Sequence, residues 1–258
     1  MAVVLLDLDE TLIHERASTR AAYRATLADA SAQRGFDAEQ AAIAVAAAAQ
    51  RLWAESPTHP YCGRIGISAG EGMWATFARG EDPDTVALRA FAPVYRRAAW
   101  RAGLESVAVG DEDLVADLAE RFVWERGRRQ IPFPEALRVL SDLRRSGHRL
   151  VLVTNGDRDL QRRKLVASGL LPLLDGAVIS GVLGIGKPEP AIFAHALGLV
   201  AARPEDAVMV GDSPSRDIAG AVASGIRAVW VDRGVDADRP VGAWRTLGDL
   251  RPLPGLLA

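Results

Sequence analysis

Five short apolar runs, each followed by a polar residue or a glycine, constrain what this chain can fold into. They are Val3–Leu6, Leu150–Val153, Ala177–Ile179, Ala207–Val210 and Ala228–Val231. Unbroken apolar runs of this length are typical of strands buried on both faces, as in a parallel sheet. Helical patterns that stop at glycines lie before the second run and between the later ones, and cover Pro134–Ser146, Arg158–Ser168, Pro190–Leu197 and Ser215–Ser224. This alternation predicts an α/β fold with a doubly wound parallel sheet.

The sequence between Asp7 and Leu150 shows no strand pattern. It predicts helices at Ala21–Ala32, Glu39–Ala54, Gly72–Arg79, Pro83–Trp100 and Asp111–Glu125, with breaks at Ser56-Pro57, Pro60–Gly70 and Gly80–Pro83. We therefore expect an all-helical domain, residues 16–127, inserted into an α/β catalytic core made of residues 1–15 and 128–258. The tail after Asp232 is rich in proline and glycine, which predicts a surface segment with a short helix near Thr246–Leu250.

Composition excludes several classes of partner. Apolar residues make up 49% of the chain, enough to bury a sizeable core, and the net charge of −2 provides no basic field for nucleic acid or an anionic membrane. The alanine-rich stretch Ala41–Ala49 is too short to span a bilayer, and the apolar N-terminal run is too short for a signal peptide. The single cysteine, Cys62, excludes an intrachain disulfide. We expect a soluble, cytoplasmic protein, either a monomer or a homodimer.

Polar residues that can carry chemistry stand directly after the predicted strands. Asp7-Leu8-Asp9-Glu10-Thr11 follows the first strand, Thr154-Asn155-Gly156 the second and Gly211-Asp212 the fourth, and Lys187 lies in the loop Gly184–Pro188. In open α/β sheets, ligands bind beyond the carboxyl ends of the strands, at the point where the strand order reverses. The sequence therefore predicts one site that gathers these side chains.

Their chemistry suits a phosphate monoester. This substrate is a dianion, so an attacking carboxylate such as Asp7 needs charge compensation, which Mg²⁺ held by Asp7 and Asp212 supplies. Lys187 adds a point charge for the phosphoryl oxygens. Asp7 can then form an aspartyl-phosphate, while Asp9 protonates the leaving oxygen and later deprotonates water.

These motifs resemble the four motifs of the haloacid dehalogenase superfamily, in the same order. Asp7-x-Asp9-x-Thr11 matches the first, Thr154-Asn155-Gly156 the second, Lys187 in Gly-Lys-Pro the third, and Gly211-Asp212-x4-Asp217 the fourth. The resemblance covers the whole chain and implies a Rossmann-like core whose helical insertion is a C1 cap domain. Glu10 stands where many members of the family have glycine.

The resemblance also implies a role for each matched residue. Asp7 is the nucleophile and a metal ligand, and Asp9 is the general acid and base and gives its backbone carbonyl to Mg²⁺. Thr154 and Lys187 bind the transferred phosphoryl group. The remaining matches are Asn155, which positions Asp7 or phosphate, Asp212, a metal ligand, and Asp217, which supports the site in the second coordination sphere or through metal-bound water.

The expected function is that of a Mg²⁺-dependent phosphatase acting on a small phosphorylated metabolite, such as a sugar phosphate, a nucleotide or a small organic phosphate. A phosphomutase or a haloacid dehalogenase on the same scaffold is the alternative, although family dehalogenases generally lack a carboxylate at the position of Asp9. A phospho-accepting signalling domain is a third reading, and the large helical insertion argues against it. Residues that can bind the leaving group, or simply pack the cap, are His14, Arg64, Trp74, Arg96, Arg97 and Trp100. Pro60–Gly70 is expected to be a specificity loop.

Overall fold

The computed structural model describes residues 2–234 and 239–258 of the chain. The chain divides into two compact units, which we call the sheet unit and the helical unit. The sheet unit contains the described parts of Met1–Glu15, Ile131–Gly156 and Leu165–Ala258, and the helical unit contains Arg16–Gln130 and Asp157–Lys164. The sequence-based boundaries placed 157–164 in the core instead. The segment groups with the helices because Leu160 packs in their apolar core and Lys164 pairs with Glu71.

Six parallel strands form the sheet, in the order β3-β2-β1-β4-β5-β6. They are β1 Val3–Leu6, β2 Arg149–Thr154, β3 Gly176–Ile179, β4 Ala207–Gly211, β5 Arg227–Val231 and β6 Arg245–Leu247. The side chains of β1 and β4 are fully buried, as their unbroken apolar sequences require when helices cover both faces. The predicted doubly wound α/β core is confirmed.

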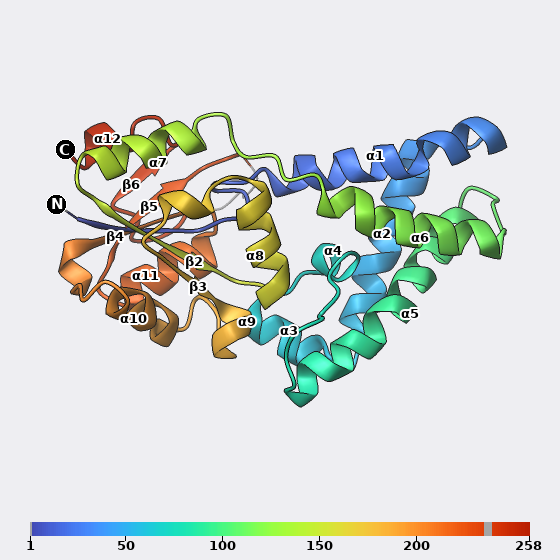
Figure 1. The fold of residues 1–258 in the computed structure, drawn as a ribbon, viewed down its shortest axis with the longest axis horizontal. Helices are drawn as coiled ribbons and strands as arrows, with labels where there is room; N and C mark the ends of the chain where they lie inside the picture. The colour runs from blue at the N-terminus through green and yellow to red at the C-terminus, as the bar shows by residue number, and fades with distance from the viewer. Residues whose placement is uncertain (1, 235–238) are drawn as a thin grey trace. The chain divides into compact units, whose positions relative to one another are not determined.

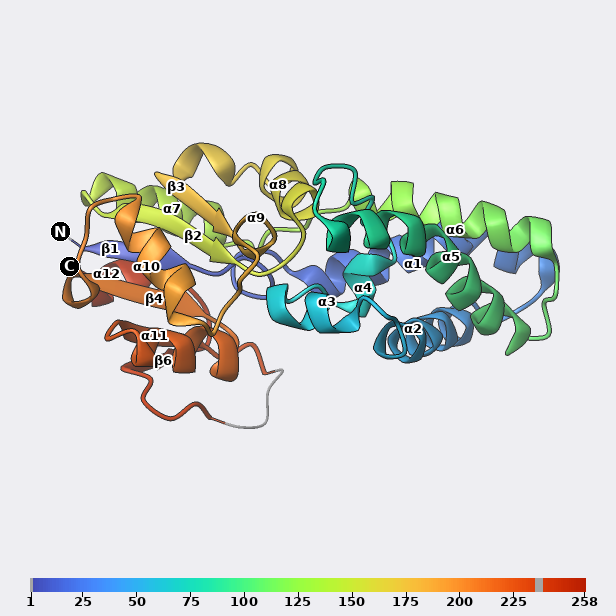
Figure 2. The same ribbon diagram turned by 90° about the horizontal axis from the view of Figure 1, so that it is seen from below.

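Helices cover each face of the sheet with an apolar stripe. On one face lie α7 (Ala136–Arg145) and α12 (Leu253–Leu256), side by side in Figure 1. On the other lie α10 (Pro190–Gly198) and α11 (Ala219–Ala223), which Figure 2 shows together. The remaining elements are α8 (Arg158–Ala167), the single turn α9 (Ser180–Leu183), 3₁₀ turns at Leu171–Leu173 and Pro204–Asp206, and a π turn at Pro214–Ile218. This π turn replaces the first half of the helix predicted over Ser215–Ser224.

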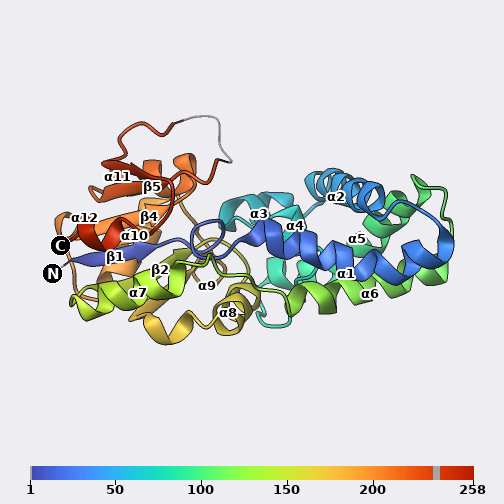
Figure 3. The ribbon, with the colours of Figure 1, turned by 90° about the horizontal axis from the view of Figure 1, so that it is seen from above.

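The helical unit has an aromatic core of its own. The helices of this unit are α1 (Glu15–Arg34), α2 (Ala38–Ala54), α3 (His59–Ile65), α4 (Ala69–Gly72), α5 (Pro83–Glu105) and α6 (Glu112–Gly127). Figure 3 shows α1 alongside α6, where Arg121 donates to Asp29 over 2.8 Å. The Tyr95 hydroxyl bonds the carbonyls of Ala49 and Ala69 at 3.2 and 2.8 Å, which ties α5 to α2 and α4.

Two helix predictions in the inserted region were wrong. The predicted break Pro60–Gly70 holds all of α3 but its first residue, because a proline in the first turn favours the start of a helix. Gly66 ends α3 in a left-handed conformation with φ 77°. The helix predicted over Gly72–Arg79 is absent, since α4 ends at Gly72. Instead, Arg89 donates to the Phe77 and Gly80 carbonyls at 2.8 and 2.7 Å and holds this stretch as a loop.

The C-terminal segment also differs from its prediction. Thr246 lies in β6, which extends the sheet beyond β5, and the last helix is α12 rather than a helix near Thr246–Leu250. A strand forms there because the edge of β5 offers main-chain partners that a three-residue pattern does not reveal. The predicted surface segment after Asp232 includes residues 235–238, which lie outside the described residues. Among the helices that the structure describes, none is both long and apolar enough to cross a membrane.

Candidate active site

Two aspartates meet at the point where the strand order reverses. Asp7 follows β1 and Asp212 follows β4, and these strands are neighbours although their onward connections run to opposite sides of the sheet. The Asp7 amide donates to the Val210 carbonyl over 3.0 Å, so the β1–β4 pairing extends to the catalytic candidate itself. The crevice at such a switch point is where doubly wound sheets bind their ligands.

Lys187 links Asp7 to Asp217. Its Nζ lies 2.5 Å from Asp7 Oδ1 and 2.6 Å from Asp217 Oδ1, and all three side chains are buried. Burial lowers the pKa of Lys187, but the charges of Asp217 and Asp7 outweigh that effect, so its pKa is raised above the ordinary value. Lys187 is therefore cationic at neutral pH where its ammonium group meets the Asp7 carboxylate.

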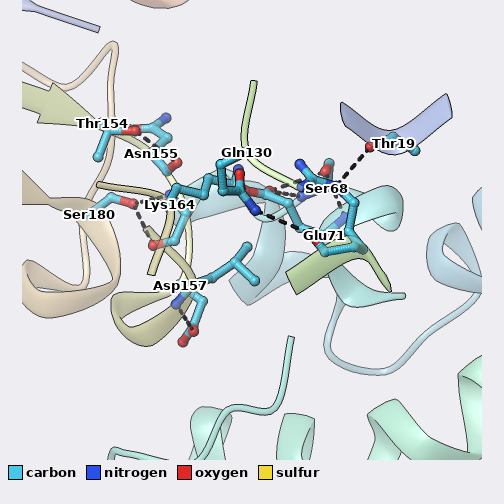
Figure 4. Close-up of polar contacts among 12 residues, drawn as sticks. Thr19, Ser68, Glu71, Gln130, Thr154, Asn155, Asp157, Lys164 and Ser180 are labelled. Carbon is cyan, nitrogen blue, oxygen red and sulfur yellow. Dashed lines mark hydrogen bonds and ion pairs between the residues drawn. The ribbon is translucent and has the colours of Figure 1, made fainter. Parts of the chain in front are cut away.

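The main chain of Lys187 is held by Asn155, which follows β2. Asn155 Nδ2 donates to the Lys187 carbonyl over 2.9 Å, and the Lys187 amide donates to Asn155 Oδ1 over 2.8 Å. Thr154 is also buried at this strand end, and Figure 4 shows its side chain beside Asn155. Asn155 thus contacts the main chain of Lys187, and the ammonium group of Lys187 contacts Asp7.

Thr11 is a site residue that received no role in the sequence analysis. Its Oγ1 lies 3.3 Å from Asp7 Oδ2 and 3.2 Å from Asp212 Oδ1, and the residue has no exposed surface. The hydroxyl donates to one carboxylate at a time and fixes the spacing of both. The signal that could have found it is the third position of the Asp-x-Asp-x-Thr motif.

Asp217 reaches the site because Gly211 leaves room for it. A Cβ atom on Gly211 would overlap the Asp217 carboxylate, so only glycine fits at the end of β4. The Ser213 amide donates to Asp217 Oδ2 over 3.0 Å, and the π turn aims the side chain back toward Lys187. Asp217 therefore contacts the lysine directly, which the sequence did not predict.

The three carboxylates can hold a metal ion. One oxygen each from Asp7, Asp212 and Asp217 lie within 4.8 Å of one another. Burial and then the Asp7 and Asp217 charges raise the pKa of Asp212 to about 9, and burial raises the pKa of Asp217 to about 6 against the opposing charge of Lys187. A divalent cation would relieve this repulsion, and oxygen-only donors suit Mg²⁺. The donor set therefore fits the predicted metal.

Asp9 lies outside that carboxylate group. It is partly exposed and pairs with Ile13 through the main chain, in the tight turn that follows β1. The resemblance in sequence implied that Asp9 binds the metal through its backbone carbonyl. A side chain that lies apart from the three carboxylates is therefore consistent with an acid/base role. Glu10 adopts the left-handed conformation, φ 57°, that glycine takes most easily, at a cost of about 1–2 kcal/mol. The departure from glycine thus leaves the turn geometry in place.

Most of the leaving-group candidates pack the helical unit. Trp74 and Trp100 have no exposed surface and belong to its apolar core. Arg64 lies over the Tyr61 ring and pairs with Asp84 within the same unit. Arg96 donates to the Ala75 carbonyl over 2.5 Å. The other two candidates are Arg97, which is exposed, and His14, which stacks on Phe133 in the sheet unit.

A buried ion pair in the helical unit was not foreseen from the sequence. Lys164 Nζ lies 3.0 Å from Glu71 Oε1, and Figure 4 shows the two side chains pointing toward each other. Lys164 has no exposed surface, and Glu71 also accepts from Ser68 in a capping box at the start of α4. No pattern in the sequence reveals the pair, because its partners are 93 positions apart.

Known hydrolases resemble this chain in sequence and in fold. A family model of haloacid dehalogenase-like hydrolases matches residues 1–225. Phosphoserine phosphatase of Thermus thermophilus is 42% identical over 252 residues, covering 97% of each chain. A crystal structure of 2-haloacid dehalogenase from Pseudomonas syringae is 28% identical, with TM-score 0.59 over 100% of this chain and 98% of the other. The magnesium-bound HAD hydrolase YfnB of Bacillus subtilis has TM-score 0.68 at 19% identity, covers 99% of this chain and 98% of its own, and shows a shared fold.

Proposed function

The chain belongs to the haloacid dehalogenase-like hydrolases and is a phosphatase, and we propose that it hydrolyses O-phosphoserine or a close phosphomonoester through an aspartyl-phosphate at Asp7. The observation that carries this proposal is the position of Asp7, whose carboxylate is held between Lys187 Nζ and Thr11 Oγ1. The relative from Thermus thermophilus supports phosphoserine as the first substrate to test, because the similarity extends over nearly the whole of both chains.

In the first step, a carboxylate oxygen of Asp7 attacks phosphorus and the bond to the leaving oxygen breaks. Asp9 gives its proton to that oxygen, which leaves as the serine hydroxyl. Lys187 and Thr154 bind the phosphoryl oxygens, and Asn155 keeps the Lys187 main chain in place. Mg²⁺ held by Asp7, Asp212, the Asp9 carbonyl and, directly or through water, Asp217 would supply charge neutralisation for the phosphoryl group.

In the second step, water attacks phosphorus while Asp9 takes one of its protons. The bond between phosphorus and Asp7 breaks, so inorganic phosphate leaves and the Asp7 carboxylate is restored. Lys187 neither gives up nor takes up a proton in either step; in the free site the Asp217 and Asp7 charges raise its pKa. The site therefore returns to its starting state without another reactant.

The test is phosphate release from a panel of phosphorylated metabolites, with and without Mg²⁺, ranked by kcat/KM. We expect O-phosphoserine to rank first and activity to be lost on chelation and restored by Mg²⁺. Asp7→Asn is the matched control, because the amide has the shape of the carboxylate but cannot attack. Wild-type activity in Asp7→Asn would exclude Asp7 as the nucleophile, and an unrelated best substrate would exclude phosphoserine.

Carbon–halogen hydrolysis is the second candidate, favoured by the 28% identical dehalogenase structure. Displacing halide requires no proton donor, so Asp9 argues for the phosphatase. Halide release from a 2-haloacid, measured beside phosphate release, separates the two activities. We further propose that the protein is cytoplasmic and is a monomer or a homodimer. Light scattering of the purified chain distinguishes the monomer from the homodimer.

A further inference from the structure

Arg233, just beyond β5, reaches the turn that carries the catalytic motif. Its Nη2 donates to the Thr11 carbonyl over 3.0 Å, and its Nη1 lies 2.9 Å from Glu135 Oε1. The guanidinium carbon lies 3.6 Å from the centre of the Phe133 ring. The side chains of Arg233 and Glu135 are only 10% and 12% exposed. We call Arg233, Glu135 and Phe133 the arginine clamp.

The arginine clamp contacts the turn formed by residues 8–13, which is held by hydrogen bonds of its own. The Leu12 and Ile13 amides both donate to the Leu8 carbonyl, at 2.8 and 2.9 Å, and the Glu10 amide donates to the Ile13 carbonyl over 2.8 Å. These bonds use the Leu8 and Ile13 carbonyls, and the Thr11 carbonyl accepts from Arg233. The clamp also reaches the next residue, since the Phe133 amide donates to the Leu12 carbonyl over 3.0 Å.

Thr11 passes this restraint to the reacting groups. Its hydroxyl lies between Asp7 Oδ2 and Asp212 Oδ1. A shift of the Thr11 main chain would therefore move the hydroxyl that donates to these two carboxylates. The planar guanidinium suits the task, because its fork can hold a carbonyl and a carboxylate at once in fixed directions. Lysine has one nitrogen and a flexible stem, so it cannot reproduce both contacts.

We propose that Arg233 is a positioning residue of the phosphatase reaction, which it serves by holding the Thr11 carbonyl and thereby the Thr11 hydroxyl between Asp7 and Asp212. This inference rests on the proposed function for its kinetic consequence. The restraint on the turn is a separate, structural consequence that can be measured without substrate. A merely structural arginine would affect stability but not the ordering of this turn relative to the rest of the sheet unit.

The first measurement is amide hydrogen exchange, followed by mass spectrometry at peptide resolution. In Arg233→Ala, the Leu12 and Ile13 amides should exchange at least about 10-fold faster, while the amides of β2 keep their protection. Arg203→Ala is the matched control, because Arg203 is exposed and its ion pairs among the described residues are with Glu205 and Asp206. Unchanged exchange at Leu12 and Ile13 would overturn the proposal.

The second measurement is steady-state kinetics. Arg233→Ala should lower kcat about 10- to 100-fold and change KM by less than about 3-fold, since the lost contact aligns groups rather than binding substrate. Added guanidinium should restore part of kcat in Arg233→Ala and nothing in Arg203→Ala. A loss of kcat that guanidinium does not reverse would overturn the proposal.

Two milder variants decide the matter if Arg233→Ala fails to fold. Arg233→Lys and Glu135→Gln should each raise exchange at Leu12 and Ile13, and wild-type exchange in both would overturn the proposal. A wild-type chain without phosphatase activity would contradict the proposed function, whereas the exchange result would still decide whether the clamp orders the turn.

Discussion

The side chain of Asn155 and the main chain of Lys187 are joined by two hydrogen bonds, one in each direction, of 2.9 and 2.8 Å. Both residues are buried, so water does not replace these bonds when one is lost. Through them, the end of β2 fixes the base of the lysine that contacts Asp7. Asn155 therefore connects the end of β2 to Lys187, whose charged group lies beside Asp7 at the end of β1.

Replacing Asn155 should uncouple the lysine from β2. We expect Asn155→Ala to lower kcat/KM about 10- to 100-fold, because Lys187 then samples positions away from the phosphoryl oxygens. Asn155→Asp keeps an acceptor for the Lys187 amide but loses the donor to its carbonyl, so its activity should also fall. Phosphate release under substrate-limiting conditions provides the measurement, and full activity in both variants would contradict this role.

Asp9→Asn should separate the two steps of the reaction. With a poor leaving group such as the serine hydroxyl, loss of the proton donor should lower kcat about 10²- to 10⁴-fold. With an activated aryl phosphate the first step needs no proton, so the phosphorylated enzyme should accumulate because water is no longer deprotonated. Mass spectrometry of the quenched enzyme reveals this species, and its absence would require another acid and base.

Gly211→Ala tests the packing beneath the site. The added Cβ would overlap the Asp217 carboxylate, which must then move away from Lys187 and the Ser213 amide. We expect a loss of about 1–3 kcal/mol in the free energy of unfolding, together with a large fall in activity. Gly198→Ala is the control, because no described atom outside its own stretch of helix lies within 4 Å of the added Cβ. Equal behaviour of the two variants would exclude this explanation.

The buried pair of Lys164 and Glu71 should couple strongly in unfolding experiments. Lys164→Met leaves the Glu71 charge buried beside an apolar side chain, so it should cost about 3–5 kcal/mol. Adding Glu71→Gln removes that charge, and the double variant should be more stable than Lys164→Met alone. Arg34→Met, which breaks the exposed pair with Asp111, should cost less than about 1 kcal/mol. Additive effects in a denaturant-based double-mutant cycle would contradict the coupling.

Asp157 should make stability depend on pH. Burial, with a contribution from the Asp159 and Glu71 charges, raises its pKa from 3.8 to about 6. Since the folded carboxyl binds its proton more tightly than the unfolded one, the stability that it contributes is present below pH 3.8 and is lost as pH rises through about 6.

Asp157→Asn should remove this dependence. Its amide oxygen can still accept from the Asp159 and Leu160 amides, which Asp157 caps at 3.1 and 3.0 Å. The free energy of unfolding of the variant, relative to that of the wild type, should therefore rise by about 2 kcal/mol between pH 4 and pH 7. Urea unfolding across that range measures the gain, with Asp37→Asn at the exposed N-cap of α2 as the control. A difference that is constant with pH would rule out the burial effect.

Local pattern was sufficient for most of the core. All five predicted strands exist, and β1 has the predicted limits, because a strand buried on both faces must be apolar throughout. The sequence could predict that Asp7 and Asp212 lie close together, because both follow strands of a parallel sheet and such strands end at the same edge. The pattern failed where proline and glycine were read only as breaks, at α3, and where a neighbouring strand supplied the hydrogen bonds, at β6.

The sequence by itself determined five of the six described strands, the helical insertion and the polar residues that follow the strands at one edge of the sheet. These features depend on local periodicity and on the identity of single residues. Only the tertiary structure decided that Lys187 joins Asp7 to Asp217 and that Arg233 reaches Thr11. Those contacts join residues far apart in the chain, and their geometry follows from how the elements pack rather than from any spacing along the sequence.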